Sequence, residues 1–122
     1  MGWSERTELL LGQEGLAKLR EARVAVIGVG GVGAYAAEML VRSGVGHMLL
    51  LDSDCVGITN INRQLVALHS TIGQPKVEVL SRRLLDINPE LELETIDSYL
   101  NEANVAELLD GRGLTFLVDA ID

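Results

Sequence analysis

The sequence predicts an α/β domain with a mostly parallel sheet and helices on both of its faces. Three observations lead to this fold class. Segments of strand and helix character alternate in the order β-α-β-α-β-α-β, the pattern of parallel strands joined by crossover helices. A glycine-rich turn directly follows the first apolar strand. Hydrophobic residues make up 48% of the 122 residues and aromatic residues only 3%, so one small domain with an aliphatic core is expected.

Each element has its own sequence signal. Short apolar runs bounded by turn residues predict strands, and apolar residues at helical spacing predict helices. Gly12 and Gly15 weaken a continuous helix, so the N-terminal arm, residues 1–22, should contain two short helical pieces. The remaining residues, 23–122, form the predicted domain. Its expected strands cover residues 24–27, 47–51, 91–96 and 114–118, and its expected helices cover residues 34–43, 75–87 and 101–109.

Four glycines, Gly28, Gly30, Gly31 and Gly33, lie between the first strand and the first core helix. This order is typical of a phosphate-binding loop in a Rossmann-like domain. A glycine permits the tight turn, glycines without a Cβ let a phosphate approach the backbone, and the helix N-terminus offers unpaired N–H groups. The alternative is a glycine turn that serves only the packing of the helix on the strand.

Asp52 follows the second strand, 24 residues after Gly28, a spacing close to the ~20 residues expected for an acid that binds a ribose. Its carboxylate can accept hydrogen bonds from both ribose hydroxyls. The alternative is an aspartate that caps the next turn. Asp54, two residues further on, could contribute to the same site or act only as a cap.

The connection between residues 54 and 75 is long enough to predict a functional loop. One apolar residue, Ile61, is expected to anchor a short helical turn to the core and to leave the polar side chains directed outward. The alternative is an ordinary polar loop. The polar residues around this anchor are Asn60, Asn62, Arg63 and Gln64.

Two charged residues at element ends also point to a phosphate ligand. Lys76 lies in the first turn of the helix that follows Pro75, where a cation opposes the helix dipole at a cost of about 0.3–1 kcal/mol. A bound anion would offset that cost; the alternative is a solvated lysine. Asp122 follows the last strand, at the edge where parallel sheets bind ligands, so it could hold Mg²⁺ against phosphates. Its alternative is a loop residue with no role.

Composition limits the other function classes. The formal net charge of −8 argues against broad nucleic-acid binding by this segment. No long apolar run and no signal-peptide pattern is found, so a soluble, cytoplasmic protein without membrane contact is expected. The single cysteine, Cys55, can form neither an internal disulfide nor a cysteine-based zinc site. Without a nearby cation it is expected to be a small buried hydrophobic residue.

Together these motifs resemble those of the ubiquitin-activating-enzyme-like adenylation superfamily, whose bacterial members include the activators of sulfur-carrier proteins. The resemblance covers nearly the whole chain. The opening segment Arg6-Thr-Glu-Leu-Leu-Leu-Gly12 is similar to that of the tRNA threonylcarbamoyladenosine dehydratase branch. The other motifs that carry the resemblance are Gly28-x-Gly-Gly-x-Gly33, Asp52-x-Asp54, Asn60-Ile-Asn-Arg63-Gln64, Gly73-Gln-Pro-Lys76, Asn88-Pro89 and Asp119-Ala-Ile-Asp122.

The resemblance implies that the chain binds ATP and Mg²⁺ and that a substrate carboxylate attacks the α-phosphate, with pyrophosphate as the leaving group. In the dehydratase branch this carboxylate belongs to threonylcarbamoyladenosine in a tRNA, and the mixed anhydride is attacked from within the modification with loss of AMP, so no protein nucleophile is needed. The implied catalytic residues are Arg63, Lys76 and, from the partner subunit of a homodimer, Arg6. The expected nucleotide-binding residues are Gly28, Gly30, Gly31, Gly33, Asp52, Asp54, Asn60, Asn62, Arg63, Gln64, Lys76 and Asp122, of which Asp122 would also serve the metal.

Enzymes of this superfamily are longer than this chain, which resembles their ATP-binding N-terminal half; a short complete protein and a fragment both stay open. Three other functions also stay open. An NAD-dependent dehydrogenase would share the glycine loop and Asp52, but it has no triphosphate for Arg63 and Lys76 to neutralise. An activator of a ubiquitin-like sulfur carrier, in thiamin or molybdopterin synthesis, would share every ATP residue and would have that carrier as its protein partner. The third is a nucleotide-binding module without catalysis.

Overall fold

The computed structural model describes residues 2–122 and contains one parallel sheet of four strands. The strands are β1 (Arg23–Ile27), β2 (His47–Leu51), β3 (Glu92–Ile96) and β4 (Phe116–Asp119). The α-helices are α1 (Glu5–Glu21), α2 (Gly33–Ser43), α3 (Lys76–Ile87) and α4 (Val105–Leu109). Short 3-10 turns are η1 (Gly2–Ser4), η2 (Ile58–Asn60) and η3 (His69–Thr71).

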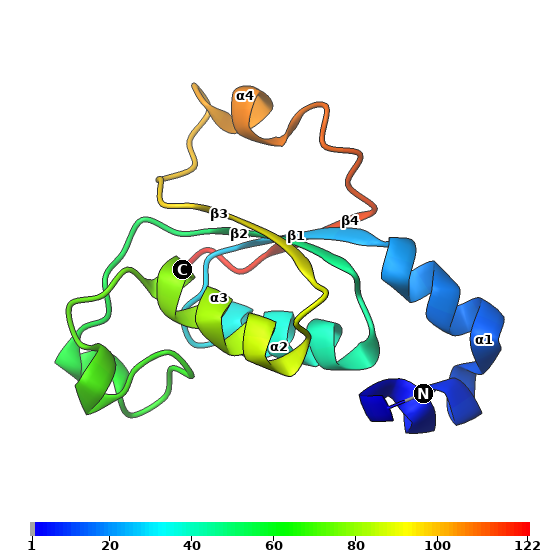
Figure 1. The fold of residues 1–122 in the computed structure, drawn as a ribbon. Helices are drawn as coiled ribbons and strands as arrows, with labels where there is room; N and C mark the ends of the chain where they lie inside the picture. The colour runs from blue at the N-terminus through cyan, green and yellow to red at the C-terminus, as the bar shows by residue number, and fades with distance from the viewer. Residues whose placement is uncertain (1) are drawn as a thin grey trace.

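The strand order β3-β2-β1-β4 shows where the chain reverses its direction across the sheet. From β1 to β3 each strand is added beside the previous one, and then the chain crosses back so that β4 pairs with β1. Helices α2 and α3 lie on one face of the sheet and α4 lies on the other (Figure 1). The predicted parallel sheet with helices on both faces is therefore confirmed. Such a reversal point, here between β1 and β4, is where open α/β sheets bind ligands at their carboxyl edge.

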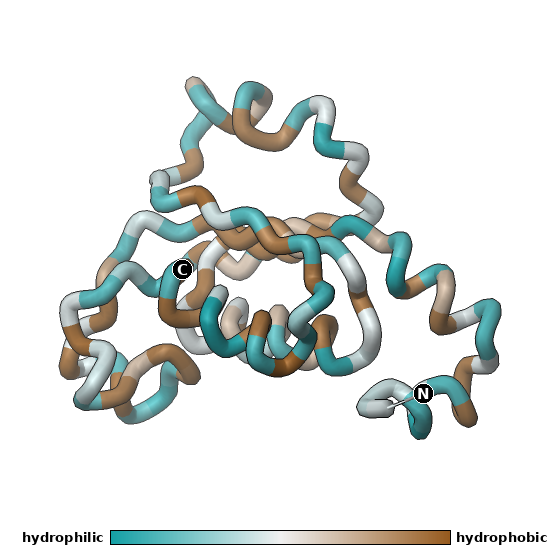
Figure 2. The backbone as a smooth tube through the Cα atoms, in the orientation of Figure 1, coloured by the Kyte–Doolittle hydropathy of each residue, from teal (hydrophilic) through white to brown (hydrophobic). Residues whose placement is uncertain are grey.

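The sheet separates two apolar clusters of different size. Val24 and Val26 point into the larger cluster with residues of α2 and α3, whereas Ala25 and Ile27 point into a smaller one beneath α4. Because both of its faces are covered, β1 is a nearly continuous hydrophobic run. Figure 2 shows this run in the middle of the molecule.

The N-terminal arm packs at the amino ends of the strands, at the far right of Figure 1. Helix α1 is broken at Gly12 (φ 75°, ψ 169°), which confirms the two predicted helical pieces. Its second piece contacts the turn after α2 so closely that a Cβ on Gly46 would lie 2.1 Å from the carbonyl oxygen of Arg20. Within residues 2–122 there is no helix with the length and apolar character needed to cross a membrane.

Three local expectations need correction. The predicted helix over 101–109 begins only at Val105, because the Asn101 side chain accepts hydrogen bonds from the backbone N–H groups of Ala103 and Asn104 and forms a turn instead. The last strand begins at Phe116 rather than at residue 114. Cys55 is exposed, not buried, since it lies in an isolated bridge with Pro75 at the surface.

Candidate functional site: a cleft at the carboxyl ends of the strands

A cleft opens where the four strands end. Segments that follow β1, β2, β3 and β4 all contribute to it, together with the start of α3 and one residue of the long connection. This arrangement confirms the prediction that Asp122 faces the same crevice as the glycine loop. The cleft is lined by Ile27, Gly28, Gly30, Gly31, Leu51, Asp52, Ser53, Asp54, Gln64, Lys76, Ser98, Tyr99, Leu100, Ala120, Ile121 and Asp122.

The glycines of the loop divide into two kinds. Gly28 has a φ of 92°, and a Cβ on it would lie 2.6 Å from the carbonyl oxygen of Ala120. A Cβ on Gly33 would lie only 1.6 Å from the carbonyl oxygen of Gly28. Gly30 and Gly31 line the cleft as Gly28 does, but they have more room: a Cβ on Gly31 would find its nearest atom 3.9 Å away. Packing therefore explains Gly28 and Gly33, while Gly30 and Gly31 keep free space above the backbone.

Asp52 connects the end of β2 to the glycine loop. Its Oδ2 accepts a hydrogen bond from the Val29 backbone N–H at 2.9 Å, and its Oδ1 accepts one from the Asp54 N–H at 2.7 Å. The carboxylate thus caps the turn after β2, which is one of the two alternatives for this residue, and it also lines the cleft, while its binding of a ribose stays a prediction. Lone pairs that these two bonds leave free can still accept a ligand hydroxyl.

Lys76 is the first residue of α3 and is only 6% exposed. Its backbone N–H donates to the Asp54 carbonyl, which fixes the helix start beside the cleft. The ammonium Nζ lies 3.9 Å from Asp54 Oδ2, which is too long for a hydrogen bond. Among residues 2–122 no acceptor within hydrogen-bond distance of this ammonium is found. A buried cation with one distant partner is costly unless a ligand supplies the missing charge.

Gln64 departs from its expected position. The turn that holds it is anchored by Ile61, which packs against the larger apolar cluster as predicted. However, the Gln64 side chain is buried at 8% exposure rather than directed outward. Its Nε2 would lie 3.5 Å from a Cβ on Gly30, and its Oε1 has no hydrogen-bond partner in the described part of the chain. Gln64 therefore supports the glycine loop and presents an unsatisfied acceptor inside the cleft wall.

Three of the expected site residues in this connection do not line the cleft. The Asn60 side chain accepts a hydrogen bond from the Gly57 N–H at 2.8 Å and so holds the η2 turn. Arg63 is exposed, and its Nη1 donates to the Thr59 carbonyl at 3.1 Å and to Asn62 Oδ1 at 2.9 Å. The stem of the Arg63 side chain nevertheless passes beside Gly31, because its Cγ would lie 3.9 Å from a Cβ on that glycine.

Arg6 lies on α1, at the opposite end of the sheet from the cleft (Figure 1). Sequence reasoning also missed one contributor to the cleft, the segment Ser98–Leu100 that follows β3. The signal for it was present, because the rule that placed Asp52 and Asp122 at strand ends applies equally to the strand over residues 91–96.

The charged groups of the cleft are three aspartates, Asp52, Asp54 and Asp122, and one lysine, Lys76. Within residues 2–122 no three histidine, cysteine, aspartate or glutamate side chains come close enough to hold a metal ion by themselves. A metal in this cleft would need oxygen ligands from the nucleotide. That requirement fits Mg²⁺, which proteins commonly bind through one or two carboxylates and substrate phosphates.

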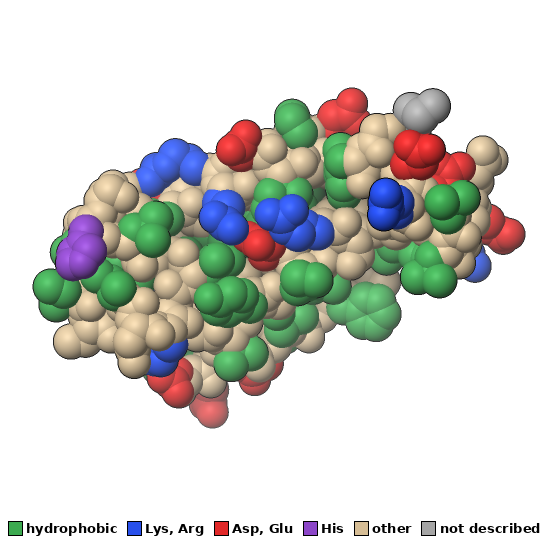
Figure 3. Space-filling model, turned by 90° about the horizontal axis from the view of Figure 1, so that it is seen from below, with side chains coloured by type: hydrophobic (Ala, Val, Ile, Leu, Met, Phe, Trp, Pro, Cys, Tyr) green, Lys and Arg blue, Asp and Glu red, His purple; other side chains and the backbone are tan. Residues whose placement is uncertain are grey.

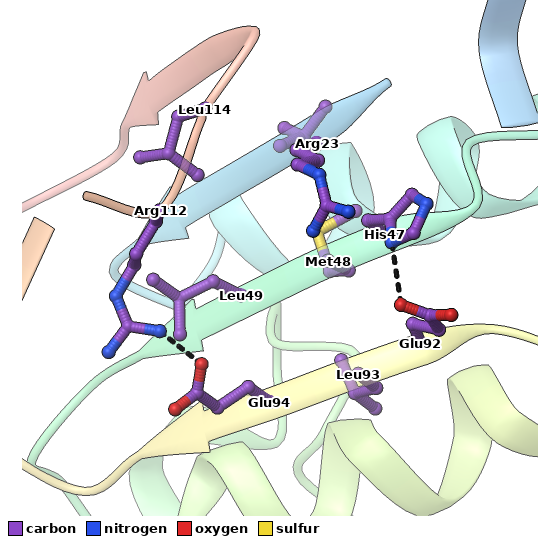
Figure 4. A pocket seen from close by; sticks show the side chains of 10 residues that line it. Arg23, His47, Met48, Leu49, Glu92, Leu93, Glu94, Arg112 and Leu114 are labelled. Carbon is purple, nitrogen blue, oxygen red and sulfur yellow. Dashed lines mark hydrogen bonds and ion pairs between the residues drawn. The ribbon is translucent and has the colours of Figure 1, made fainter. Parts of the chain in front are cut away.

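A second cavity lies on the α4 face near the amino ends of the strands (Figure 4). Four of its ionisable groups lie in two pairs: Arg112 contacts Glu94, and His47 Nδ1 lies 2.9 Å from Glu92 Oε2, an ion pair only when the imidazole is protonated. Because it has no glycine loop and Arg112 is already paired with Glu94, this cavity lacks the features that a nucleotide requires.

Known proteins resemble the chain over nearly its whole length. It is 52% identical over 117 residues to the tRNA threonylcarbamoyladenosine dehydratase of Bacillus subtilis, which covers 96% of this chain and 46% of that protein. It is 39% identical to the molybdopterin-synthase adenylyltransferase of Salmonella typhimurium, over 83% of this chain and 41% of that protein. The crystal structure of the E. coli tRNA N6-threonylcarbamoyladenosine dehydratase in complex with ATP superposes with a TM-score of 0.93 at 40% identity, covering 98% of this chain and 50% of that one.

The chain thus spans about half the length of the relatives it matches. The model of the ThiF family matches residues 5–122, from the start of α1 through the glycine loop to the last aspartate of the cleft. The chain belongs to the ThiF family.

Proposed function

We propose that this chain is the ATP-binding part of an adenylating enzyme. The observation that carries the proposal is the Lys76 side chain, which is 7% exposed, lines the cleft together with the open glycines of the loop and has one carboxylate contact at 3.9 Å. A triphosphate supplies the negative charge that this position lacks. The similarity to an enzyme crystallised with ATP supports the choice of ligand.

The proposed reaction is the attack of a substrate carboxylate oxygen on the α-phosphorus of ATP. The bond to the bridging oxygen breaks, pyrophosphate leaves, and an acyl adenylate forms. Lys76 would offset charge on the leaving group, and Arg63 would reach it by exchanging its contacts to Thr59 and Asn62 for phosphate oxygens. Gly30 and Gly31 would allow the phosphates to lie against the backbone, and Asp52 would accept hydrogen bonds from the ribose.

Asp122 is the residue we propose for Mg²⁺, with phosphate oxygens and water as the other ligands. The metal, when bound, would neutralise charge on the phosphates during the displacement. The negative lining of the cleft supports this choice, because three aspartates and one lysine alone would repel a triphosphate.

The substrate we propose is the carboxylate of threonylcarbamoyladenosine in a tRNA, in the cytoplasm where tRNA is modified. The relative with 52% identity is a tRNA threonylcarbamoyladenosine dehydratase, and that similarity supports this substrate over others. The similarity to a molybdopterin-synthase adenylyltransferase favours a second candidate, the C-terminal carboxylate of a sulfur-carrier protein. Both candidate functions use the same ATP-binding residues and differ in the substrate that binds beside the nucleotide.

We further propose that the protein acts as a homodimer in which Arg6 completes the site of the partner. The distance between α1 and the cleft of its own subunit supports this arrangement (Figure 1). An apolar stripe runs from Val32, just before α2, to Tyr35 and Met39 on that helix, with exposed fractions of 74%, 49% and 61%. The helical face seen in Figure 3 exposes many hydrophobic side chains. A second copy seated there would lie next to the glycine loop, where α2 begins.

Isothermal calorimetry tests the ligand. ATP with Mg²⁺ should bind and NAD⁺ should not, and removal of Mg²⁺ should weaken the binding of ATP. Binding of NAD⁺ alone would overturn the proposal in favour of a dehydrogenase.

Mass spectrometry of tRNA nucleosides from a gene-deletion strain tests the substrate. Loss of the cyclic, dehydrated threonylcarbamoyladenosine is expected. An unchanged nucleoside profile together with a requirement for thiamin or molybdopterin would transfer the assignment to the sulfur-carrier activators. An unchanged profile without such a requirement would favour a nucleotide-binding module without catalysis.

A further inference from the structure

The Asp54 side chain has a single charged contact, and that contact is with the buried lysine of the cleft. Its Oδ2 lies 3.9 Å from Lys76 Nζ, and within residues 2–122 its carboxylate accepts no hydrogen bond. It therefore caps neither a turn nor a helix, in contrast to the carboxylate of Asp52, which accepts two backbone N–H groups. A role for the Asp54 carboxylate has to come from its charge and from its neighbour.

The backbone of Asp54 is fixed, while its side chain is free to turn. Its N–H donates to Asp52 Oδ1 at 2.7 Å, and its carbonyl accepts the N–H of Lys76 at 3.0 Å. The Asp54 side chain is 72% exposed, whereas that of Lys76 is 7% exposed. An exposed side chain without other bonds can change between staggered rotamers at little cost, and the buried lysine lacks this freedom. Asp54 is therefore the partner that moves when a ligand takes its place.

A phosphate ligand and Asp54 compete for the same ammonium. In the free cleft the Asp54 carboxylate supplies part of the negative charge that Lys76 lacks, so an anion that replaces it gains less from the lysine. After the side chain has turned away, its charge still lies at the cleft with those of Asp52 and Asp122 and repels the phosphates. A triphosphate that carries Mg²⁺ has a smaller net charge and is repelled less.

We propose that Asp54 is a counter-ion that Lys76 exchanges for phosphate, and that this exchange makes the cleft select triphosphates that carry Mg²⁺ over those that do not. The inference rests on the proposed function, because it requires that Lys76 bind the phosphates of the ligand. It goes beyond that function by giving Asp54 an effect against binding, in place of the nucleotide contact that the resemblance implies. Removal of this carboxylate should consequently strengthen the binding of phosphates.

Calorimetry at constant ionic strength tests the exchange, with ATP and inorganic tripolyphosphate as ligands in the presence of Mg²⁺ or of EDTA. Asp54→Asn should lower the dissociation constants of both ligands at least about threefold in EDTA and less than about twofold with Mg²⁺. Tripolyphosphate has neither a ribose nor a base, so an equal gain for both ligands assigns the effect to the phosphates.

Further variants separate charge from other effects. Asp54→Ser removes the charge without adding an amide and should match Asp54→Asn, whereas Asp54→Glu keeps the charge and should bind both ligands like the wild type. Asp86→Asn is the matched control: it removes an exposed carboxylate on α3, outside the cleft, and should change no dissociation constant. In a Lys76→Met background, Asp54→Asn should strengthen binding by a smaller factor, because the proposed competition concerns that lysine.

Three outcomes would contradict the inference at different points. Unchanged or weaker binding of tripolyphosphate by Asp54→Asn and Asp54→Ser, in a protein whose wild type binds ATP, would overturn the counter-ion role and leave the phosphate site intact. An equal gain with and without Mg²⁺ would overturn the selection of the metal-bound triphosphate. If the wild type binds neither ATP nor tripolyphosphate under either condition, the proposed function itself fails, and the inference about Asp54 fails with it.

Discussion

Gly31 and Gly33 stand two residues apart in one loop, yet the structure gives them different constraints. A Cβ on Gly33 would overlap the carbonyl oxygen of Gly28 at 1.6 Å, whereas a Cβ on Gly31 would meet its nearest atom at 3.9 Å. The backbone cannot move away at Gly33 without separating α2 from β1. The free space at Gly31 has no packing purpose, and this makes Gly31 the residue that can distinguish a binding loop from a packing turn.

Alanine substitutions at these two positions should therefore have opposite effects. Gly33→Ala should destabilise the fold by about 3 kcal/mol or more, because the clash is with backbone atoms. Gly31→Ala should change the free energy of unfolding by less than about 0.5 kcal/mol and weaken ATP binding at least about tenfold. Urea unfolding and calorimetry measure the two quantities. Undiminished ATP binding by a folded Gly31→Ala protein would show that the loop serves packing alone.

Lys76 should show the conflict between binding and stability. Lys76→Met keeps the length of the side chain and removes a buried charge, so the protein should be as stable as the wild type or up to about 1 kcal/mol more stable. Its affinity for ATP should fall more than its affinity for AMP, because the proposed contact is with the outer phosphates. The control is Lys18→Met on exposed α1, which should leave both affinities unchanged. A strongly destabilised Lys76→Met would indicate a structural lysine.

Single residues in the long connection show where prediction from sequence stops. Ile61 was predictable as an anchor, because burial of a lone apolar side chain is favourable and its polar neighbours can remain in water. The burial of Gln64 was not predictable, since its polarity favoured solvent and only the fold brings it beside Gly30. The exposure of Cys55 likewise depends on its bridge with Pro75, a contact between distant parts of the chain.

At the scale of elements, periodicity predicted the positions of the longer strands and helices, but not those of the short elements. β1, β2 and α3 match their predicted ranges within one residue, since continuous apolar runs and a clear apolar face define them. The prediction made α4 too long, because an asparagine such as Asn101 can either cap a helix or form a turn. Its two hydrogen bonds with Asn104 stabilise the turn. Part of the contact between α2 and α3 is an ion pair between two charged side chains, which no local sequence pattern predicts.

Glu38 on α2 forms that ionic link. It accepts hydrogen bonds from Arg83 of α3 and, at 3.3 Å, from Arg42 of its own helix. The hydrogen bond from Arg83 is the main cause that lowers the pKa of Glu38 below its usual value of 4.5, and the same pair raises the pKa of Arg83. A lowered carboxylate pKa stabilises the fold above the unfolded-state pKa, and this contribution is lost as the pH falls through the folded-state value.

Glu38→Gln should therefore cost about 0.5–1 kcal/mol at pH 7, where the pair is fully ionised, and progressively less below pH 4.5. Urea unfolding at a series of pH values measures the difference between wild type and variant. Glu14→Gln on α1 replaces an exposed glutamate and should show no such pH dependence. A difference that stays constant down to about pH 3 would mean that the link between α2 and α3 is not ionic.

At the scale of the whole molecule, the cleft and α1 occupy opposite ends of the sheet (Figure 1). Arg6 therefore cannot reach the glycine loop of its own subunit without a large movement of the arm, which is packed at Gly44 and Gly46. The apolar stripe begins at Val32, next to Gly31 of the cleft, and we propose that a symmetric dimer through that face brings the partner's arm near each site. Such a dimer would have two sites, each built from both subunits, and this consequence can be tested.

Mixed dimers of an active preparation of the protein provide that test. Homodimers of Arg6→Ala and of Lys76→Ala should both be inactive, because each lacks one required cation at every site. In a mixed dimer, one site carries both defects, and the other combines an intact Lys76 with an intact Arg6 from its neighbour. Random exchange between equal amounts of the two inactive proteins should then restore about a quarter of the wild-type activity. Exchange can be verified by mass spectrometry with one subunit tagged. If exchange is complete and no activity returns, Arg6 does not act across the dimer, because only a shared site can be rebuilt from two defective subunits.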